Sequence, residues 1–417
     1  MMLRSLAPCP SMGRGPGPGF AGWLAMAAVG LLLGACATTT APQSSTPPPP
    51  PAPAIAHADP RPEPAPRVTA TGKLKVALLL PLSGRARDIG NSMLEAAELA
   101  IFDGAGRDIA IIPIDTGDSP DRAVAAVQRA AQSGAVILLG PLFGPATAAA
   151  ALAARDANLE MVSFSNDEGV AQPGVYPMGL GVQTQVRRVA DYALSKGIRR
   201  FAAFAPATPY GQQATQALRD AVTSRGGTVA AAERFNFKDG NLTGGVDRVT
   251  QAITAEGSGT TALLLPVAGP PLAAATQALT TTNPDAKKAQ LIGTGVWDTP
   301  AIASEGGLSG AWFAAPDPSR RAEFERKFEA VHGKAPHRLA TLAYDAVTMA
   351  ARLARAKPGG DFTASGLTDP AGFQGLDGLF RFRADGRVER ALAVLEIGNE
   401  RVRIVDPAPS SLDQPTN

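Results

Sequence analysis

The stretch KLKVALLLPLSG, residues 73–84, decides the fold class. Apart from Lys75, residues 74–80 are apolar, as is typical of a strand buried on both faces of a parallel sheet. Ser83-Gly84 follows as a turn, and apolar residues then recur at helical spacing from Ile89 through Met93 to Ala100. A buried strand, a turn and an amphipathic helix form the first unit of an α/β chain.

The same unit recurs as far as residue 165. Strand-like runs are predicted at 108–115, 135–140 and 161–165, and helices at 120–132 and 145–157. This alternation predicts a doubly wound α/β lobe.

A second series with the same logic begins near Gln183. It predicts helices at 184–196, 210–225 and 271–281, and strands at 201–204, 228–235, 262–266 and 290–293. The chain is therefore expected to form two similar lobes, with a first crossing between them around residues 176–182.

The N-terminal segment reads as a secretory signal. Arg4 and Arg14 precede an apolar run, residues 20–35, that is too short to span a bilayer comfortably. The run closes on LGAC, residues 33–36, which resembles the lipobox of bacterial lipoproteins. That resemblance implies a signal peptide over residues 1–35 and a mature chain that begins at an acylated Cys36 and is held at a membrane by its lipid. The alternative is an ordinary cleavage site with an incidental cysteine.

Two features bear on where such a lipoprotein resides. In lipoproteins of this type an aspartate after the cysteine signals retention at the inner membrane, and this chain has Ala37 there. The periplasmic side of the outer membrane is therefore favoured. Residues 36–72 form a predicted disordered linker, since residues 41–67 contain 11 prolines in 27 positions and favour extended polyproline II. The linker is interpreted as a tether, with a PxxP ligand as the alternative.

Charge and cysteine content exclude several classes of partner and site. Removal of Arg4 and Arg14 with the signal leaves 37 basic and 37 acidic residues, a balance that disfavours nucleic acid as a partner. The only other cysteine, Cys9, lies in the signal, so no disulfide or thiolate metal site is expected in the folded part.

Several longer segments together resemble the type I periplasmic binding proteins of the leucine-binding class. They are KVALLLPLSGRARDIGNSMLEAAELAIFD (75–103), IDTGDSPDRAVAAVQRAAQSGAVILLGPLFGPAT (114–147), TPYGQ (208–212), LAYDAV (342–347) and GFQGLDGLFRFRADGRVERALAVLEI (372–397). This resemblance implies an α/β fold of two doubly wound, Rossmann-like lobes joined by three crossover strands. Lobe 1 is then expected at 73–181 plus about 315–388, lobe 2 at 182–314 plus about 389–408, and a disordered tail at 409–417. Asp385-Gly386 is expected to turn a tight hairpin.

A narrower resemblance concerns the lipoproteins called penicillin-binding protein activators. It is carried by GPLFGPAT (140–147), VSFSND (162–167), GVYPMGL (174–180), GTGVWD (293–298) and GAWFAAPDP (310–318), together with the lipobox and linker. It implies a non-enzymatic outer-membrane lipoprotein that binds and stimulates a bifunctional penicillin-binding protein in cell-wall synthesis. The N-terminal helical-repeat domain of the best-known activators has no counterpart here. The alternative is a substrate-binding lipoprotein of an ABC importer for amino acids or another small molecule.

Candidate ligand-binding residues lie where predicted strands end, because helix N-termini there offer free N–H groups. The candidates are Ser83, Gly144, Thr147, Ser165, Asn166, Tyr210 and Trp297. Four of these also have a structural interpretation: Ser83, like Thr208, as a helix cap, Gly144, like Gly211, as a turn residue, and Tyr210 and Trp297 as core. Tyr344-Asp345 is interpreted as helix packing with a solvated carboxylate.

The loops depart from a standard amino-acid site. Amino-acid binders of the leucine-binding class usually offer hydroxyls after the third strand, where this chain has Gly144-Pro145-Ala146 before Thr147. Asp167 in the next loop would repel a ligand carboxylate.

No catalytic or metal-binding pattern is recognised. His57 lies in the linker, and His332 and His337 flank a short loop, so neither a Ser-His-Asp triad nor a metal-ligand spacing occurs. The aspartates at 115, 118 and 121 fit turn and helix-start roles better than an acid/base pair. The chain is expected to be no enzyme and to need no cofactor or metal.

Overall fold

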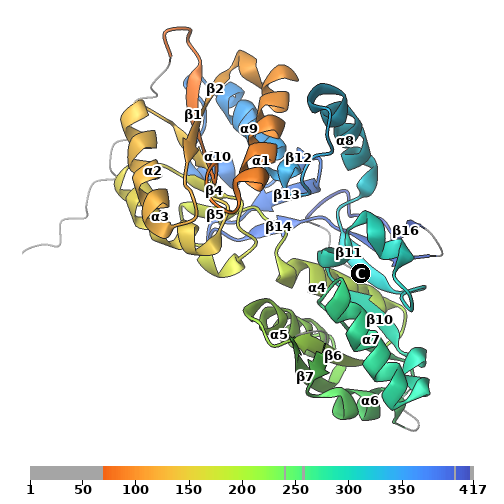
Figure 1. Ribbon diagram of the computed structural model, residues 1–417. Coiled ribbons are helices and arrows are strands. Elements are labelled where there is room, and N and C mark those ends of the chain that lie inside the picture. Colours follow the sequence, from red (N-terminus) through yellow and green to blue (C-terminus); the bar gives the residue numbers. More distant parts are fainter. Residues whose placement is uncertain (1–68, 239–240, 256–258, 399–400, 414–417) are drawn as a thin grey trace, which may run out of the picture. The chain divides into compact units, whose positions relative to one another are not determined.

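The computed structural model describes residues 69–238, 241–255, 259–398 and 401–413 (Figure 1). The predicted signal peptide, Cys36 and most of the predicted linker lie outside the described residues. Residues 409–413, from the predicted tail, are described, and Asp413 pairs with Arg381 at 2.5 Å.

The first sheet is parallel throughout, with the strand order β2-β1-β3-β4-β5. Its strands are β1 (Leu74–Leu80), β2 (Ile109–Asp115), β3 (Ile137–Leu139), β4 (Met161–Ser163) and β5 (Val175–Pro177). Helices cover both faces: α1 (Arg87–Phe102) and α9 (Ala340–Ala356) on one, α2 (Pro120–Ser133) and α3 (Gly144–Asp156) on the other (Figure 1). Val76 and Leu78 of β1 pack towards α1 and α9, whereas Ala77 and Leu79 pack towards α2 and α3. This double burial explains why β1 is almost wholly apolar.

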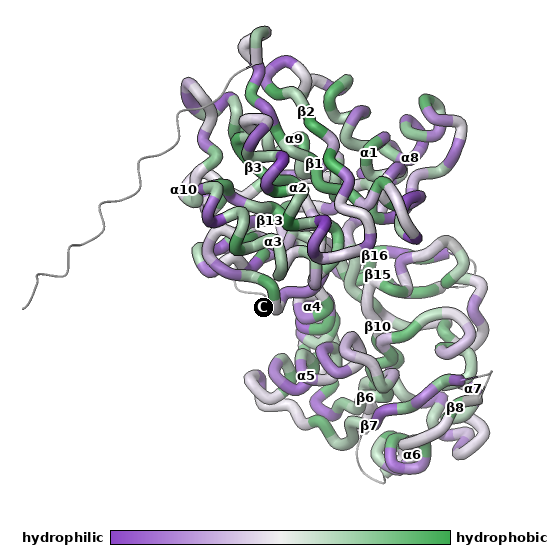
Figure 2. The backbone as a smooth tube through the Cα atoms, turned by 60° about the vertical axis from the view of Figure 1, so that its left-hand side comes forward, coloured by the Kyte–Doolittle hydropathy of each residue, from purple (hydrophilic) through white to green (hydrophobic). Residues whose placement is uncertain are grey.

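The second sheet is mixed, with the order β16-β15-β11-β10-β9-β6-β7-β8. Its strands are β6 (Arg200–Pro206), β7 (Thr228–Lys238), β8 (Asn241–Thr243), β9 (Thr261–Leu264), β10 (Gln290–Gly293), β11 (Trp312–Ala315), β15 (Ala393–Ile397) and β16 (Val402–Asp406). One face is covered by α4 (Val182–Ser195) and α5 (Pro209–Thr223), the other by α6 (Val246–Thr254) and α7 (Pro270–Thr282). Figure 2 shows hydrophobic and hydrophilic residues alternating along α4, as a helix with one buried face requires.

The chain passes between the two sheets three times. It leaves the first sheet between β5 and α4, returns between β11 and α8 (Pro318–His332), and crosses again at Ala391-Leu392 after β14. Before that last crossing it forms α9, the short α10 (Ala364–Leu367) and an antiparallel sheet of β12 (Phe373–Gly375), β13 (Gly378–Phe382) and β14 (Val388–Arg390). Phenylalanines of this small sheet join the core of the first lobe.

The predicted fold class is confirmed: two doubly wound α/β lobes are joined by three crossing segments. The hairpin predicted at Asp385-Gly386 is also confirmed, because Phe382 pairs with Val388 and Gly386 adopts the left-handed φ of 87° that the turn requires.

Candidate functional site

The candidate residues lie at the carboxyl ends of the parallel strands, the usual ligand position in doubly wound folds. In the first lobe these ends carry the loops after β1, β3 and β4, which contain Ser83, the start of α3, and residues 164–167. In the second lobe they carry the start of α5 and the loop after β10. The structure separates candidates that remain available to a ligand from those committed to internal bonds.

Ser83 is committed to a neighbouring loop and caps no helix. Helix α1 begins at Arg87, and the Ser83 hydroxyl instead donates to Asp115 Oδ2 at 2.7 Å. Asp115 also accepts hydrogen bonds from the backbone N–H groups of Leu82 and Gly117, and it forms an ion pair with Arg122 at 2.6 Å. Burial raises the pKa of the Asp115 carboxyl, but these hydrogen bonds and the Arg122 charge outweigh it and hold that pKa below its usual range.

Thr147 is fully buried and cannot present its hydroxyl to a ligand. Its Oγ1 donates to the carbonyl of Phe143 at 3.0 Å and lies 2.6 Å from the Ser163 hydroxyl. Ser163 in turn donates to the Pro141 carbonyl at 3.0 Å. The Thr147 hydroxyl, which follows Gly144-Pro145-Ala146 in the sequence, therefore connects the end of β4 to the loop after β3.

Asp167 lies against the first residue of α3. A Cβ atom built on Gly144 would be only 3.0 Å from Asp167 Oδ2, and Ser165 Oγ accepts the Asp167 N–H at 3.0 Å. Gly144 is thus a position of close approach and not a turn residue, Ser165 is buried, and Asn166 is exposed. The positive end of the α3 dipole is faced by the chain's own carboxylate, which disfavours a ligand carboxylate there.

In the second lobe, Tyr210 remains a candidate ligand-binding residue. It is half-buried, its hydroxyl lies 2.8 Å from Thr294 Oγ1, and burial raises its pKa. The adjacent Thr208 is confirmed as the cap of α5, since its hydroxyl accepts the Gly211 N–H at 3.2 Å. Gly211 lies within α5, where a Cβ would come within 2.1 Å of the Pro206 carbonyl oxygen, so close packing and not a turn explains this glycine.

Trp297 is a core residue of the second lobe. It is fully buried, its Nε1 donates to the Val267 carbonyl at 2.7 Å, and its ring packs edge-on against Phe313 at 6.2 Å between centroids. Of its two interpretations, the structure supports packing, and Trp297 is removed from the ligand-binding candidates.

The neighbouring Asp298 anchors a charge cluster whose partners sequence reasoning missed. Arg321 of α8 donates to both of its oxygens at 2.5 and 2.9 Å, and Arg338 donates to Oδ2 at 3.0 Å. Arg338 also pairs with Asp377 at 3.1 Å. A loop of the second sheet is therefore tied to α8 and to the start of α9, which belong to the first lobe.

The expectation of a solvated carboxylate at Asp345 is wrong. Asp345 is buried and accepts the N–H groups of Leu376 at 2.7 Å and Asp377 at 3.3 Å. A Cβ on Gly375 would lie 2.2 Å from Asp345 Oδ2, so that glycine makes the approach possible. Burial, reinforced by the Asp377 charge, raises the pKa of Asp345 to about 7.

Two of the three aspartates near α2 have the predicted roles: Asp115 accepts the Gly117 N–H in a turn, and Asp121 lies in the first turn of α2. Asp118 differs, because its Oδ2 accepts the Arg85 N–H at 2.7 Å from the loop after β1. Among the described residues, no cluster of three or more His, Cys, Asp or Glu side chains fits a metal ion. The His332 ring packs against Phe328 at a tilt of 41°, and His337 Nδ1 accepts the Leu339 N–H. None of the helices within the described ranges is both long and apolar enough to cross a bilayer.

Comparison with known proteins agrees with this architecture. The family model described as "Periplasmic binding protein" matches residues 73–401. Among solved structures, one from Rhodospirillum rubrum, described as a "putative branched-chain amino acid ABC transporter", is 22% identical to this chain with a TM-score of 0.69. The alignment covers 80% of this chain and 100% of that chain. An ABC transporter substrate-binding protein from Sphaerobacter thermophilus is 17% identical to this chain with a TM-score of 0.64. The alignment covers 82% of this chain and 99% of that chain.

A third structure, a solute-binding protein from R. palustris in complex with benzoate, aligns at 18% identity, a TM-score of 0.57, and 82% and 98% of the two chains. A search of curated protein sequences finds no significant match. At these identities the structural similarity establishes the fold alone.

Proposed function

This chain belongs to the periplasmic binding protein family, and we propose that it is a non-enzymatic protein that captures a small molecule with the loops at the carboxyl ends of its sheets. The observation that carries the proposal is the family match, which spans both lobes and every one of these loops. Substrate-binding lipoprotein of an ABC importer is the corresponding cellular role.

The structure of the loops restricts the ligand. The Thr147 and Ser163 hydroxyls are hydrogen-bonded to each other, and Asp167 lies against the start of α3. Among the candidate residues, the exposed amide of Asn166 and the half-buried ring of Tyr210 are left for a ligand. We therefore expect a neutral or cationic group of the ligand, and not a carboxylate, to lie beside α3.

A thermal unfolding screen tests the proposal. The mature chain with Cys36→Ser would be heated with a panel of amino acids, amines, sugars and aromatic carboxylates. A ligand at a hundred times its Kd adds about 2.7 kcal/mol of stability, which is readily measured as a rise in Tm. We expect a saturable rise with a neutral or cationic compound, and its loss in Asp167→Ala but not in the exposed control Asp121→Ala. A panel with no saturable rise, or a rise only with carboxylates that Asp167→Ala leaves intact, would overturn the proposal.

A second candidate is a lipid-anchored regulator of a peptidoglycan synthase, reaching a bifunctional penicillin-binding protein from the periplasmic side of the outer membrane. The observations that favour it are the proline-rich residues 41–67 and the internal commitment of the Thr147 and Ser163 hydroxyls, which removes donors from the usual ligand position. The mature Cys36→Ser chain would be added to the purified synthase while glycan polymerisation and cross-linking are followed. A dose-dependent rise in either rate supports this role, and unchanged rates with an active synthase exclude it.

A further inference from the structure

Helices α1 and α8 lie side by side on the first lobe and carry the two most exposed large hydrophobic side chains of the described residues (Figures 1 and 2). Phe102, the last residue of α1, is 84% exposed, and Val331, near the end of α8, is 59% exposed. They flank an ion pair between the helices, because Phe102 precedes Asp103 and Val331 lies one turn after its partner Lys327. Neighbouring apolar side chains left in water are typical of a surface that contacts another protein.

A pocket of about 440 Å³ lies next to Phe102. It is formed by Asp103 and by residues of α8, α9 and β12. The rings of Phe324 and Tyr344, which meet edge-on at 5.4 Å between centroids, belong to its wall. The pocket therefore suits an aromatic side chain, which can pack against these rings.

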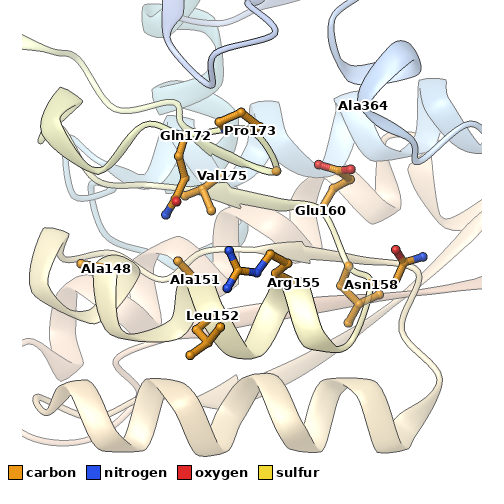
Figure 3. Close-up of a pocket in the computed structure, with 12 residues that line it drawn as sticks. Ala148, Ala151, Leu152, Arg155, Asn158, Glu160, Gln172, Pro173, Val175 and Ala364 are labelled. Atoms are coloured by element: carbon orange, nitrogen blue, oxygen red, sulfur yellow. The ribbon is translucent and has the colours of Figure 1, made fainter. Parts of the chain in front are cut away.

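Charged groups in this pocket are open to a partner, unlike those of the pocket of about 480 Å³ beside α3 (Figure 3). Beside α3, Arg155 already has an interaction partner, and the unpartnered oxygen of Glu160 is closed to solvent. Arg320 and Glu323 of α8 are both exposed, and within the described ranges neither forms a hydrogen bond or an ion pair. They lie one turn apart on the same side of α8, so this surface presents an unpaired cation and an unpaired anion.

A surface that carries both charges, an exposed aromatic side chain and a pocket for one is complementary to itself. In a two-fold symmetric dimer every contact occurs twice, so Arg320 of each copy can meet Glu323 of the other. A different protein would have to supply the same groups in matching positions. The balance of 37 basic and 37 acidic residues in the mature chain also means that two copies do not repel each other through net charge.

We propose that this chain forms a two-fold symmetric homodimer through these faces of α1 and α8. Phe102 of each copy enters the partner subunit's pocket, and Arg320 pairs with the partner subunit's Glu323. Val331 adds apolar surface beside this contact. None of these residues belongs to the candidate ligand loops, so dimerisation and ligand capture are tested separately.

Sedimentation velocity of the mature Cys36→Ser chain over a concentration series tests the proposal without any ligand. We expect a reversible equilibrium between monomer and dimer. Phe102→Ser should raise the dissociation constant of the dimer at least tenfold, because it removes the aromatic side chain from the pocket. The matched control is Leu152→Ser, which removes the exposed leucine of α3 and should dimerise as the wild type does.

Reversal of the two charges tests the symmetric pairing. Arg320→Glu alone and Glu323→Arg alone bring like charges together twice in the interface, so each should weaken dimerisation at least tenfold. The double variant exchanges the charges and should recover nearly the wild-type dissociation constant, which a merely structural role of either residue does not predict. Glu329→Arg, an exposed change on the opposite side of α8 from Arg320, is the control and should have no effect.

Far-UV circular dichroism checks that each variant folds. If Phe102→Ser does not fold, Gln374→Trp, at an exposed position on the pocket wall, should block the entry of Phe102 and weaken dimerisation. A chain that stays monomeric at every concentration would leave this surface to a different protein and overturn the proposal. Wild-type dimerisation in a folded Phe102→Ser or Gln374→Trp would do the same, as would a double charge variant that dimerises no better than the single ones.

Discussion

A carboxylate persists inside a protein only when donors or cations replace the water it loses, and Asp298 and Asp345 meet this requirement in different ways. Asp298 faces two guanidinium groups, from Arg321 and Arg338. Asp345 accepts two backbone N–H groups and retains a raised pKa. An aspartate within an apolar helical pattern gives only a weak sequence signal, because its partners come from a turn about thirty residues away.

Asp298→Asn is expected to destabilise the chain by about 3 kcal/mol, since it leaves two poorly exposed guanidinium groups facing a neutral amide. Urea unfolding measures this difference as a lower midpoint at an unchanged m-value. Asp121→Asn, at an exposed site on α2, should shift stability by no more than about 0.5 kcal/mol. Equal stability of the two variants would show that the Asp298 pairs contribute nothing measurable.

The raised pKa of Asp345 predicts a pH dependence of a definite sign. With a folded pKa of about 7 and an ordinary value of 3.8, the folded chain keeps a proton that the unfolded chain has already released between these limits. Stability should therefore fall as the pH rises from about 4 to about 7, by up to about 1.4 kcal/mol per pH unit. Asp345→Asn, which cannot ionise, should lose this slope in denaturant titrations. A variant that keeps the wild-type slope would assign the titration to another group.

At the scale of helices and strands, hydrophobic periodicity located many of the elements, although it did not predict α6 or α8. It placed β1 and α1 correctly because a strand covered on both faces and a helix covered on one leave distinct spacings. It could not identify which small residues touch another element. Gly211 is needed because α5 passes close to the end of β6, and Thr147 because it bonds to Ser163 of β4. Such contacts depend on the third dimension and leave no local signature.

Close approach of helices to loops gives a test at this scale. A Cβ on Gly90 of α1 would lie 2.2 Å from the Pro81 carbonyl oxygen, and one on Gly211 would lie 2.1 Å from that of Pro206. Gly90→Ala and Gly211→Ala should therefore destabilise by about 1–3 kcal/mol, although alanine is the better helix former. Gly306→Ala, where a Cβ meets nothing within 4 Å, should be nearly neutral. Chemical denaturation compares the three, and a neutral Gly90→Ala would argue against this packing.

At the scale of the whole molecule, the sequence predicted two lobes, and the crossings at residues 178–181, 316–317 and 391–392 agree with that plan. It predicted the candidate site less well: Trp297 and Thr147 proved to be internal, whereas Asn166 and Tyr210 remain available. The position of a strand end follows from the pattern of the chain. The direction of a side chain at that end depends on partners such as Asp167, which no periodicity reveals.

Membrane attachment is tested on the full-length chain. If Cys36 is acylated, Cys36→Ala should move nearly all of the protein from the membrane fraction to the soluble fraction, because stable anchoring needs more than one acyl chain and none would remain. Cys9→Ala, which changes the other cysteine, should stay with the membranes. Fractionation followed by immunoblotting reads out both. Membrane retention of Cys36→Ala would point to a different means of attachment.

The third crossing has a consequence for biosynthesis. The core of the first lobe draws on Leu342 of α9 and Phe380 of β13, and that of the second on Val394 of β15. Neither lobe has its complete core until the C-terminal part of the polypeptide has been synthesised. An N-terminal fragment that leaves the ribosome early therefore cannot bury the apolar residues of either core fully. A ribosome that stalls before Ala340 would release a product with both cores open, a substrate for chaperones and proteases. Stable folding of both lobes thus depends on synthesis of the residues after Ala340.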